Sequence, residues 1–252
     1  MEYKNYKIFA DFSPITVYEY ETTDSTNTRA RELAKNGIKK AAVIAEGQTA
    51  GRGRLGRSFK SDTGLGLYMS LVVYPKNTRS ALTLTALMGV AVCRAIKRET
   101  GIQAKIKWIN DIILGEKKLA GILAEGEFDE AGNLKYSIIG VGINLIPRDF
   151  SELSEIATSL GEYCTPPDAK KLARAVICEF YRICRKKNYK KELSYYRENS
   201  TVIGNEVNVI KANETYRAHA VGIADDFSLI AKRDGITELI SSCEVSIRKP
   251  TN

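Results

Sequence analysis

Apolar residues recur at helical spacing in several stretches of the chain. This periodicity predicts helices over residues 28–36, 82–99 and 168–187. The first follows a run of helix-capping residues, Thr23 to Asn27, and ends at Gly37. The second is strongly apolar and closes at Gly101. The third carries an apolar face made of Leu172, Val176, Ile177, Phe180 and Ile183.

Between these helices lie short apolar or alternating runs of the kind that form strands. They predict strands over 41–45, 65–74, 104–108, 112–114, 119–128 and 136–144, with a turn at 129–133 joining the last two. Residues 46–61 between the first two strands are polar and rich in glycine. Helices and strands therefore mix along this part of the chain, and we expect an α+β body around a mixed β-sheet.

The texture changes after Asn188. From Gly204 onward come short alternating runs at 207–210, 216–223, 227–231 and 245–248, separated by turns at 213, 225–226 and 234–235. This pattern predicts a small β-barrel attached to the α+β body. We accordingly divide the chain into a larger domain, 1–196, and a small C-terminal domain, 197–252.

Composition narrows the class of protein. With 44% hydrophobic residues the chain can form an ordinary globular core. Its first residues contain no apolar stretch for a signal peptide. The longest apolar run, Ala86 to Cys93, is far shorter than the ~18–20 residues of a membrane helix. We expect a soluble, cytoplasmic protein with no membrane partner.

Metal and triad chemistry are poorly supported. The chain has 5 cysteines with no Cys-x-x-Cys pair, and His219 is its 1 histidine. We expect free structural thiols in a reducing compartment, with a reactive cysteine as the alternative. We therefore expect no bound metal site.

The formal charge of +8 favours an anionic partner, whether nucleic acid, a nucleotide or an acidic protein. Three arginines are concentrated in the segment Gly51-Arg52-Gly53-Arg54-Leu55-Gly56-Arg57, directly after a predicted strand. Glycines let the backbone take positive φ and approach a ligand, and arginines suit phosphate and carboxylate. A flexible basic loop or an RNA-binding patch are the alternatives. The segment is neither a Walker loop nor a dinucleotide fingerprint. A later basic run, Arg182 to Lys187, indicates a solvated helix face.

Three further segments carry polar or glycine residues at strand ends. Lys105 to Asp111 ends in Asn-Asp, which alone indicates a turn as readily as a site. Lys117 to Leu123 is a basic pair entering an apolar strand, and it also fits a charged hairpin end. Gly140 to Asn144 places glycines inside a strand, which indicates either a close approach or a plain bulge.

Taken together, in their order and spacing, these segments resemble the biotin protein ligases. The matching stretches also include Asp24 to Asn27, Gln48 and Gly66 to Ser70. The likeness runs from about Thr22 to Arg248 and therefore covers nearly the whole chain. It implies the catalytic fold of biotin and lipoate ligases, similar to class II synthetases, with an SH3-like C-terminal barrel. Because the first motif starts at Asp24, it also implies the short form without a DNA-binding domain, and hence no DNA partner.

The resemblance implies a two-step activity with ATP and Mg2+. Biotin and ATP would form biotinyl-5′-adenylate, and biotin would then pass to a lysine of a biotin carboxyl carrier protein. The implied catalytic residues are Lys118, Arg52, Arg54 and Asp111. The implied biotin-binding residues are Ser25, Thr26, Asn27, Gln48, Gly51, Arg52, Gly53, Arg54, Lys118, Gly121 and Gly142. The implied nucleotide-binding residues are Arg54, Arg57, Phe59, Lys107, Trp108, Asn110 and Asn144.

The sequence departs from the family pattern at two positions. Ile109 stands where the family commonly has proline, and Phe59 where it often has a tryptophan that packs on adenine. Alternatives are a lipoate ligase or octanoyl transferase, a nucleic-acid-binding module and an inactive biotin-binding relative. The resemblance also leaves open a homodimer formed by pairing of sheet edges.

Overall fold

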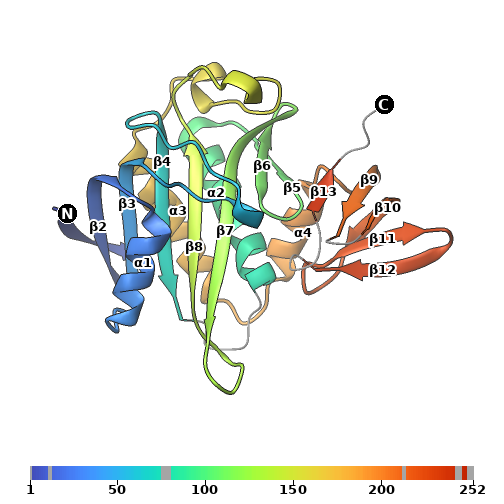
Figure 1. The fold of residues 1–252 in the computed structure, drawn as a ribbon, viewed down its shortest axis with the longest axis horizontal. Coiled ribbons are helices and arrows are strands. Elements are labelled where there is room, and N and C mark those ends of the chain that lie inside the picture. The colour runs from blue at the N-terminus through green and yellow to red at the C-terminus, as the bar shows by residue number, and fades with distance from the viewer. Residues whose placement is uncertain (1, 11–12, 75–80, 212–213, 242–245, 249–252) are drawn as a thin grey trace.

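The computed structural model describes residues 2–10, 13–74, 81–211, 214–241 and 246–248. Its larger unit is an eight-stranded mixed sheet in the order β1-β2-β3-β4-β8-β7-β6-β5 (Figure 1). The strands are β1 Lys4–Ala10, β2 Ser13–Thr23, β3 Ala41–Gln48, β4 Gly66–Val73, β5 Lys105–Lys107, β6 Asp111–Leu114, β7 Lys117–Phe128 and β8 Leu134–Asn144. The helices are α1 Thr26–Lys35, α2 Ala81–Thr100, α3 Ala169–Cys184 and α4 Lys190–Glu198, with short turns η1 Arg54–Gly56, η2 Ser151–Leu153 and η3 Leu160–Glu162.

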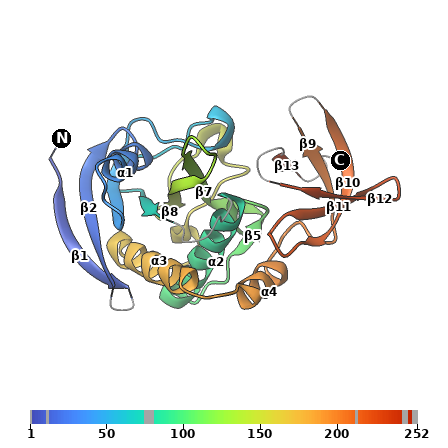
Figure 2. The same cartoon turned by 90° about the horizontal axis from the view of Figure 1, so that it is seen from below.

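Helices cover both faces of this sheet. The parallel pair β2–β3 is joined through α1, as parallel strands require a crossover connection. Helix α1 packs on β3, β4 and β8, whereas α2 and α3 lie together on the opposite face (Figure 2). Helix α2 is apolar almost all round, and residues around its circumference, such as Leu84, Val90 and Ile96, are fully buried. The core therefore lies between the sheet and the α2–α3 layer.

The C-terminal unit is a five-stranded antiparallel sheet in the order β12-β11-β10-β9-β13. Its strands are β9 Glu206–Ile210, β10 Thr215–Ile223, β11 Leu229–Arg233, β12 Ile236–Ile240 and β13 Ser246–Arg248. This small sheet fits the expected SH3-like unit. The predicted turn residue Asn213, the strand position Val245 and Cys243 lie outside the described residues.

The small sheet is attached to the α+β body by buried contacts. Trp108 follows β5, and its indole Nε1 donates a hydrogen bond to the carbonyl oxygen of Phe227 at 2.9 Å. The Phe227 ring packs edge-on against Tyr196 of α4, with 5.6 Å between ring centroids. Arg197 of the same helix donates through Nε to the carbonyl oxygen of Ile223 at 2.8 Å. Helix α4 therefore joins the two units, and the predicted boundary at residue 196 lies inside it.

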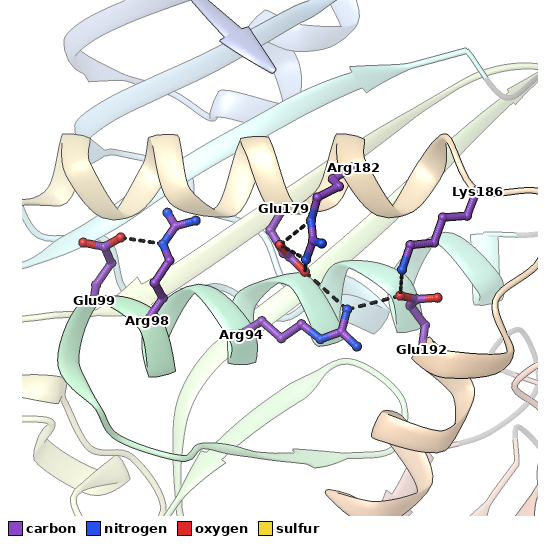
Figure 3. A network of polar contacts seen from close by, with 7 residues as sticks. All are labelled: Arg94, Arg98, Glu99, Glu179, Arg182, Lys186 and Glu192. Carbon is purple, nitrogen blue, oxygen red and sulfur yellow. Dashed lines mark hydrogen bonds and ion pairs between the residues drawn. The ribbon is translucent and has the colours of Figure 1, made fainter. Parts of the chain in front are cut away.

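A charged network ties α4 to the helix layer (Figure 3). Arg94 of α2 lies 3.3 Å from a carboxylate oxygen of Glu179 on α3 and 3.2 Å from one of Glu192 on α4. Lys186, which follows α3, also pairs with Glu192. Burial alone would raise the pKa of Glu192, but hydrogen bonds from Lys186 and Arg94 outweigh it and hold the pKa below its ordinary value. The carboxylate is therefore bound as an anion between two cations.

The predicted helices and strands of the α+β body are present in the structure, which also contains elements that were not predicted. The helices expected at 28–36, 82–99 and 168–187 correspond to α1, α2 and α3, and the six strands of the body correspond to β3 through β8. No element was predicted for the hairpin of β1 and β2, for α4 or for β12. In β2, the inward residues Ile15 and Val17 alternate with polar and aromatic ones, so the two-residue period is present but is obscured by charge.

Candidate active site

A cavity of about 50 Å³ opens between the start of α1, the ends of β7 and β8 and the arginine–glycine loop, residues 51–57. In Figure 1 this loop, with η1, crosses in front of β8 and β7. The cavity brings together segments far apart in sequence. Its lining residues are Ser25, Thr26, Asn27, Gln48, Arg52, Gly53, Arg54, Phe59, Asn110, Lys118, Gly121, Ile122, Leu123, Gly140, Val141 and Gly142.

One wall of the cavity is a buried hydrogen-bond network. The Gln48 Oε1 accepts from the backbone N–H of Thr26 at 2.8 Å, and Gln48 Nε2 donates to Ser61 Oγ at 2.8 Å. Ser70 Oγ lies 2.7 Å from Thr26 Oγ1 and 2.6 Å from Asn27 Oδ1. Because buried polar groups must find partners, this network holds each amide and hydroxyl in one position.

Asp24 stabilises the turn that leads into this wall. Its carboxylate accepts from the backbone N–H of Ser25 at 2.7 Å and from the Thr23 hydroxyl at 2.9 Å, and it pairs with Arg29. Burial would raise the pKa of Asp24, but these hydrogen bonds and the Arg29 charge lower it below its ordinary value. An ionised Asp24 therefore fixes the backbone from which Ser25 and Thr26 enter the cavity.

The opposite wall is built from paired strand glycines. Gly121 of β7 pairs with Gly142 of β8, and the Phe59 ring lies over them. A Cβ at Gly142 would lie 2.5 Å from Phe59 Cε1, and one at Gly121 would lie 3.5 Å from Phe59 Cε2. Glycine is therefore required at 142 for an aromatic ring to reach the sheet. The ring predicted to contact adenine thus lies against the glycines predicted to contact biotin.

Two basic residues of the cavity, Arg54 and Lys118, belong to one chain of polar contacts. Lys118 Nζ lies 2.7 Å from Asp111 Oδ1, and Asn110 Nδ2 donates to the same oxygen at 3.0 Å. Arg54 Nη1 donates to Asn110 Oδ1 at 3.1 Å. The loop arginine, the Asn-Asp segment and the β7 lysine therefore meet, although they come from three separate motifs.

The arginine–glycine loop meets the expectation of positive φ at one of its three glycines. Gly56 has a positive φ (73°), and so does its neighbour Leu55 (56°). Gly51 serves close packing instead, because a Cβ there would lie 2.4 Å from the carbonyl oxygen of Phe59. Arg52 extends back towards α1, where its Nη2 donates to Thr28 Oγ1 at 2.5 Å. The loop is thus anchored at its base and at Arg52.

A second cavity of about 120 Å³ adjoins the first on the side of β5 and β6. It is lined by the loop and by most of the predicted nucleotide-binding residues: Arg54, Arg57, Phe59, Lys107, Trp108 and Asn110. The Trp108 indole N–H is used in the bond to Phe227, and the peptide bond between Trp108 and Ile109 is cis. A ligand here would therefore meet another part of Trp108 than its N–H.

Asn144 lies apart from the other predicted residues. It lines none of the cavities described here. Its Nδ2 donates to the carbonyl oxygen of Thr158 at 2.9 Å, and its Oδ1 accepts from Arg148 at 2.9 Å. Its amide is therefore engaged in holding the chain after β8, and its predicted nucleotide contact stays a prediction.

The sequence reasoning missed Glu125 of β7. Its Oε2 accepts from Asn27 Nδ2 at 2.6 Å, and its Oε1 lies 3.0 Å from Arg31 and 3.8 Å from Arg52. The available signal was a carboxylate two residues after the Lys117–Leu123 motif, in a strand whose preceding residues are apolar. Glu125 lines a third cavity of about 460 Å³ on the outer side of the loop.

Within the described parts of the chain, no group of three or more His, Cys, Asp or Glu side chains is placed to hold a metal ion. Likewise, no helix there is long and apolar enough to cross a membrane.

Comparison with known proteins identifies the family. The model of the biotin/lipoate A/B protein ligase family matches residues 19–144. The chain belongs to this family. It is 34% identical over 237 residues to the bifunctional ligase/repressor BirA of Bacillus subtilis, and the aligned part covers 88% of this chain and 71% of that protein. It is 30% identical over 236 residues to the biotin–[acetyl-CoA-carboxylase] ligase of Mycobacterium tuberculosis, covering 88% and 85% of the two chains.

A solved structure agrees over nearly the whole fold. The biotin protein ligase from Aquifex aeolicus in complex with biotin and ATP superposes with a TM-score of 0.82 at 29% identity, covering 93% of this chain and 99% of that chain. The resemblance drawn from the sequence motifs and the expected fold class are confirmed, and the chain is a ligase.

Proposed function

We propose that this enzyme uses ATP to convert biotin to biotinyl-5′-adenylate and then transfers biotin to a lysine of a biotin carboxyl carrier protein. The observation that carries the proposal is the convergence of Lys118, Arg54, Asn110 and Asp111 beside a cavity with one polar wall and one glycine wall. Biotin has a polar ureido edge, an apolar ring system and a carboxylate, so it presents groups that match all three features. The relatives named for biotin support the same substrate.

In the first step, an oxygen of the biotin carboxylate attacks the α-phosphorus of ATP. The bond between the α-phosphorus and the bridging oxygen breaks, and pyrophosphate leaves. The nucleophile is already ionised at neutral pH, so the protein contributes position and positive charge. A lysine ammonium has three N–H donors. Asp111 accepts one from Lys118, which leaves two for the biotin carboxylate and the α-phosphate.

Magnesium enters this reaction with its substrate. Mg2+ in such sites is held mainly by phosphates with one or two carboxylates. Arg52, Arg54 and Arg57 then complement the remaining negative charge.

In the second step, the acceptor amine attacks the carbonyl carbon of the adenylate, an amide forms and AMP leaves. A free lysine ammonium has a pKa of ~10.4, so it must lose a proton to react. Asp111 uses Oδ1 for Lys118 and Asn110, and we assign its Oδ2 to orient the incoming amine and accept its proton. The homodimer, the cytoplasmic location and the absence of a DNA-binding domain stay predictions.

Transfer of labelled biotin to a purified biotin carboxyl carrier domain tests this function. We expect ATP- and Mg2+-dependent labelling by the wild type and its collapse in Lys118→Ala. Lys117→Ala is the matched control, because Lys117 Nζ instead donates to the carbonyl oxygen of Ser154 at 2.7 Å. Acceptance of lipoate or octanoate in place of biotin would contradict the proposed substrate.

A further inference from the structure

We infer that Glu125 is a positioning residue that sets the direction of the hydrogen bonds in the polar wall of the cavity, so that Thr26 presents a hydrogen-bond acceptor to the ligand. The inference deepens the proposed function and rests on it for the identity of the ligand. Glu125 does not line this cavity and acts through Asn27, which does.

The direction is determined at the Glu125 end. An ionised carboxylate only accepts hydrogen bonds. The contact of 2.6 Å between Glu125 Oε2 and Asn27 must therefore be donated by the amide NH2 of Asn27. This orientation turns the carbonyl oxygen of Asn27 towards Ser70. Arg31, 3.0 Å from the other oxygen of Glu125, pairs with the carboxylate from its far side.

The direction then passes to Thr26. Ser70 is fully buried and has one hydroxyl proton. Asn27 Oδ1 can only accept, so the Ser70 proton is donated to it across 2.6 Å. The contact of 2.7 Å between Ser70 and Thr26 is then donated by the Thr26 hydroxyl. The 3.1 Å contact from Thr26 Oγ1 to Gln48 Oε1 gives way, since Thr26 has one hydroxyl proton and two hydroxyl oxygens 2.7 Å apart need a proton between them.

The Thr26 hydroxyl therefore directs its proton away from the cavity and its lone pair towards it. Biotin carries two ureido N–H groups that need acceptors. Tight packing prevents Asn27 from escaping this arrangement, because a Cβ at Gly140 would lie only 2.2 Å from Asn27 Oδ1. Without the Glu125 carboxylate, the amide of Asn27 can flip and the chain of donors can reverse.

Exchanging the amide and the carboxylate tests the inference. Glu125→Gln has one acceptor oxygen for two donors, Asn27 and Arg31. In Asn27→Asp two carboxylates, those of residues 27 and 125, lie opposite each other and repel. In the double variant Asn27→Asp/Glu125→Gln the carboxylate is on α1 and the amide is on β7. The amide of the new glutamine donates to the new aspartate, which also accepts from Ser70. The Ser70 and Thr26 protons therefore keep their direction.

Biotin affinity of the full chain is measured by titration calorimetry without ATP or carrier protein, with circular dichroism as a check on folding. We expect each single variant to bind about tenfold more weakly, as for loss of one hydrogen bond to a charged group, and the double variant to recover most of this. Glu127→Gln is the control, on the same strand and the same face as Glu125. A double variant no tighter than the weaker single would overturn the inference.

The result separates this inference from the proposed function. If the wild type binds lipoate and not biotin, the proposed substrate is wrong. Lipoate has no ring N–H group to meet the Thr26 acceptor, so the same four proteins are then compared by their unfolding in denaturant, and a double variant no more stable than the weaker single variant would overturn the role of Glu125 in the polar wall.

Discussion

Gly140→Ala should disrupt the polar wall by displacing the side chain of Asn27. The new Cβ would lie 2.2 Å from Asn27 Oδ1, about 1.2 Å short of the 3.4 Å at which ordinary van der Waals contact begins. Gly140 lies in the interior of β8, and Asn27 is buried in the first turn of α1. The side-chain amide must therefore move.

The expected cost follows from the bonds that this movement breaks. Displacing the amide by this amount loses the bond from Ser70 and the charge-assisted bond to Glu125. A neutral bond contributes ~1 kcal/mol and one to a charged group ~1.5–3 kcal/mol, so we expect the free energy of unfolding to fall by about 2–4 kcal/mol. Biotin binding should weaken as well, because Thr26 is held through the same network.

Denaturant unfolding followed by circular dichroism measures the loss. Gly222→Ala is the control, since a Cβ there would be 3.8 Å from Ile230, in ordinary contact. In an Asn27→Ala background there is no side-chain amide for the new Cβ to clash with, so Gly140→Ala should lower the free energy of unfolding by less than about 1 kcal/mol. A Gly140→Ala protein as stable as wild type, or an equal loss in both backgrounds, would refute this reasoning.

Three further predictions follow from other contacts. Trp108→Phe removes the indole donor and leaves the buried carbonyl of Phe227 unpaired, so unfolding free energy should drop by about 1–3 kcal/mol in denaturant titrations; a drop below 0.5 kcal/mol would contradict it. Glu192→Gln should cost about 2 kcal/mol at pH 7, less than the ~3–5 kcal/mol for a fully buried pair because Arg94 is partly exposed. The pKa of Glu192 is lower in the folded protein than in the unfolded chain. The stabilisation is therefore present above the unfolded pKa and disappears as pH falls through the folded pKa, so the unfolding free energies of wild type and variant should converge in acid. A difference that stays constant with pH would be inconsistent with the lowered pKa. Asp111→Asn should slow biotin transfer to the carrier more than pyrophosphate release, and equal slowing of both steps would remove its assigned role.

The helices and most strands were predictable because their signals are local. Residues three or four apart in a helix, or two apart in a strand, share a face, and burial imposes that period on the sequence. Two elements lacked a clear local signal. In β2 the two-residue period is masked by charged and aromatic residues, and α4 is short and polar. The order of the motifs also carried the family assignment.

The type of most elements and the identity of the motifs could therefore be read from the amino-acid sequence alone. Which side chains meet depends on the three-dimensional fold. Asn27 and Glu125 are 98 positions apart, and Trp108 and Phe227 are 119 apart. No local period relates such pairs. Their contacts depend on the order of the strands and on how α1 and the small sheet pack against the body. That arrangement is determined by burial of apolar residues that are far apart in the sequence.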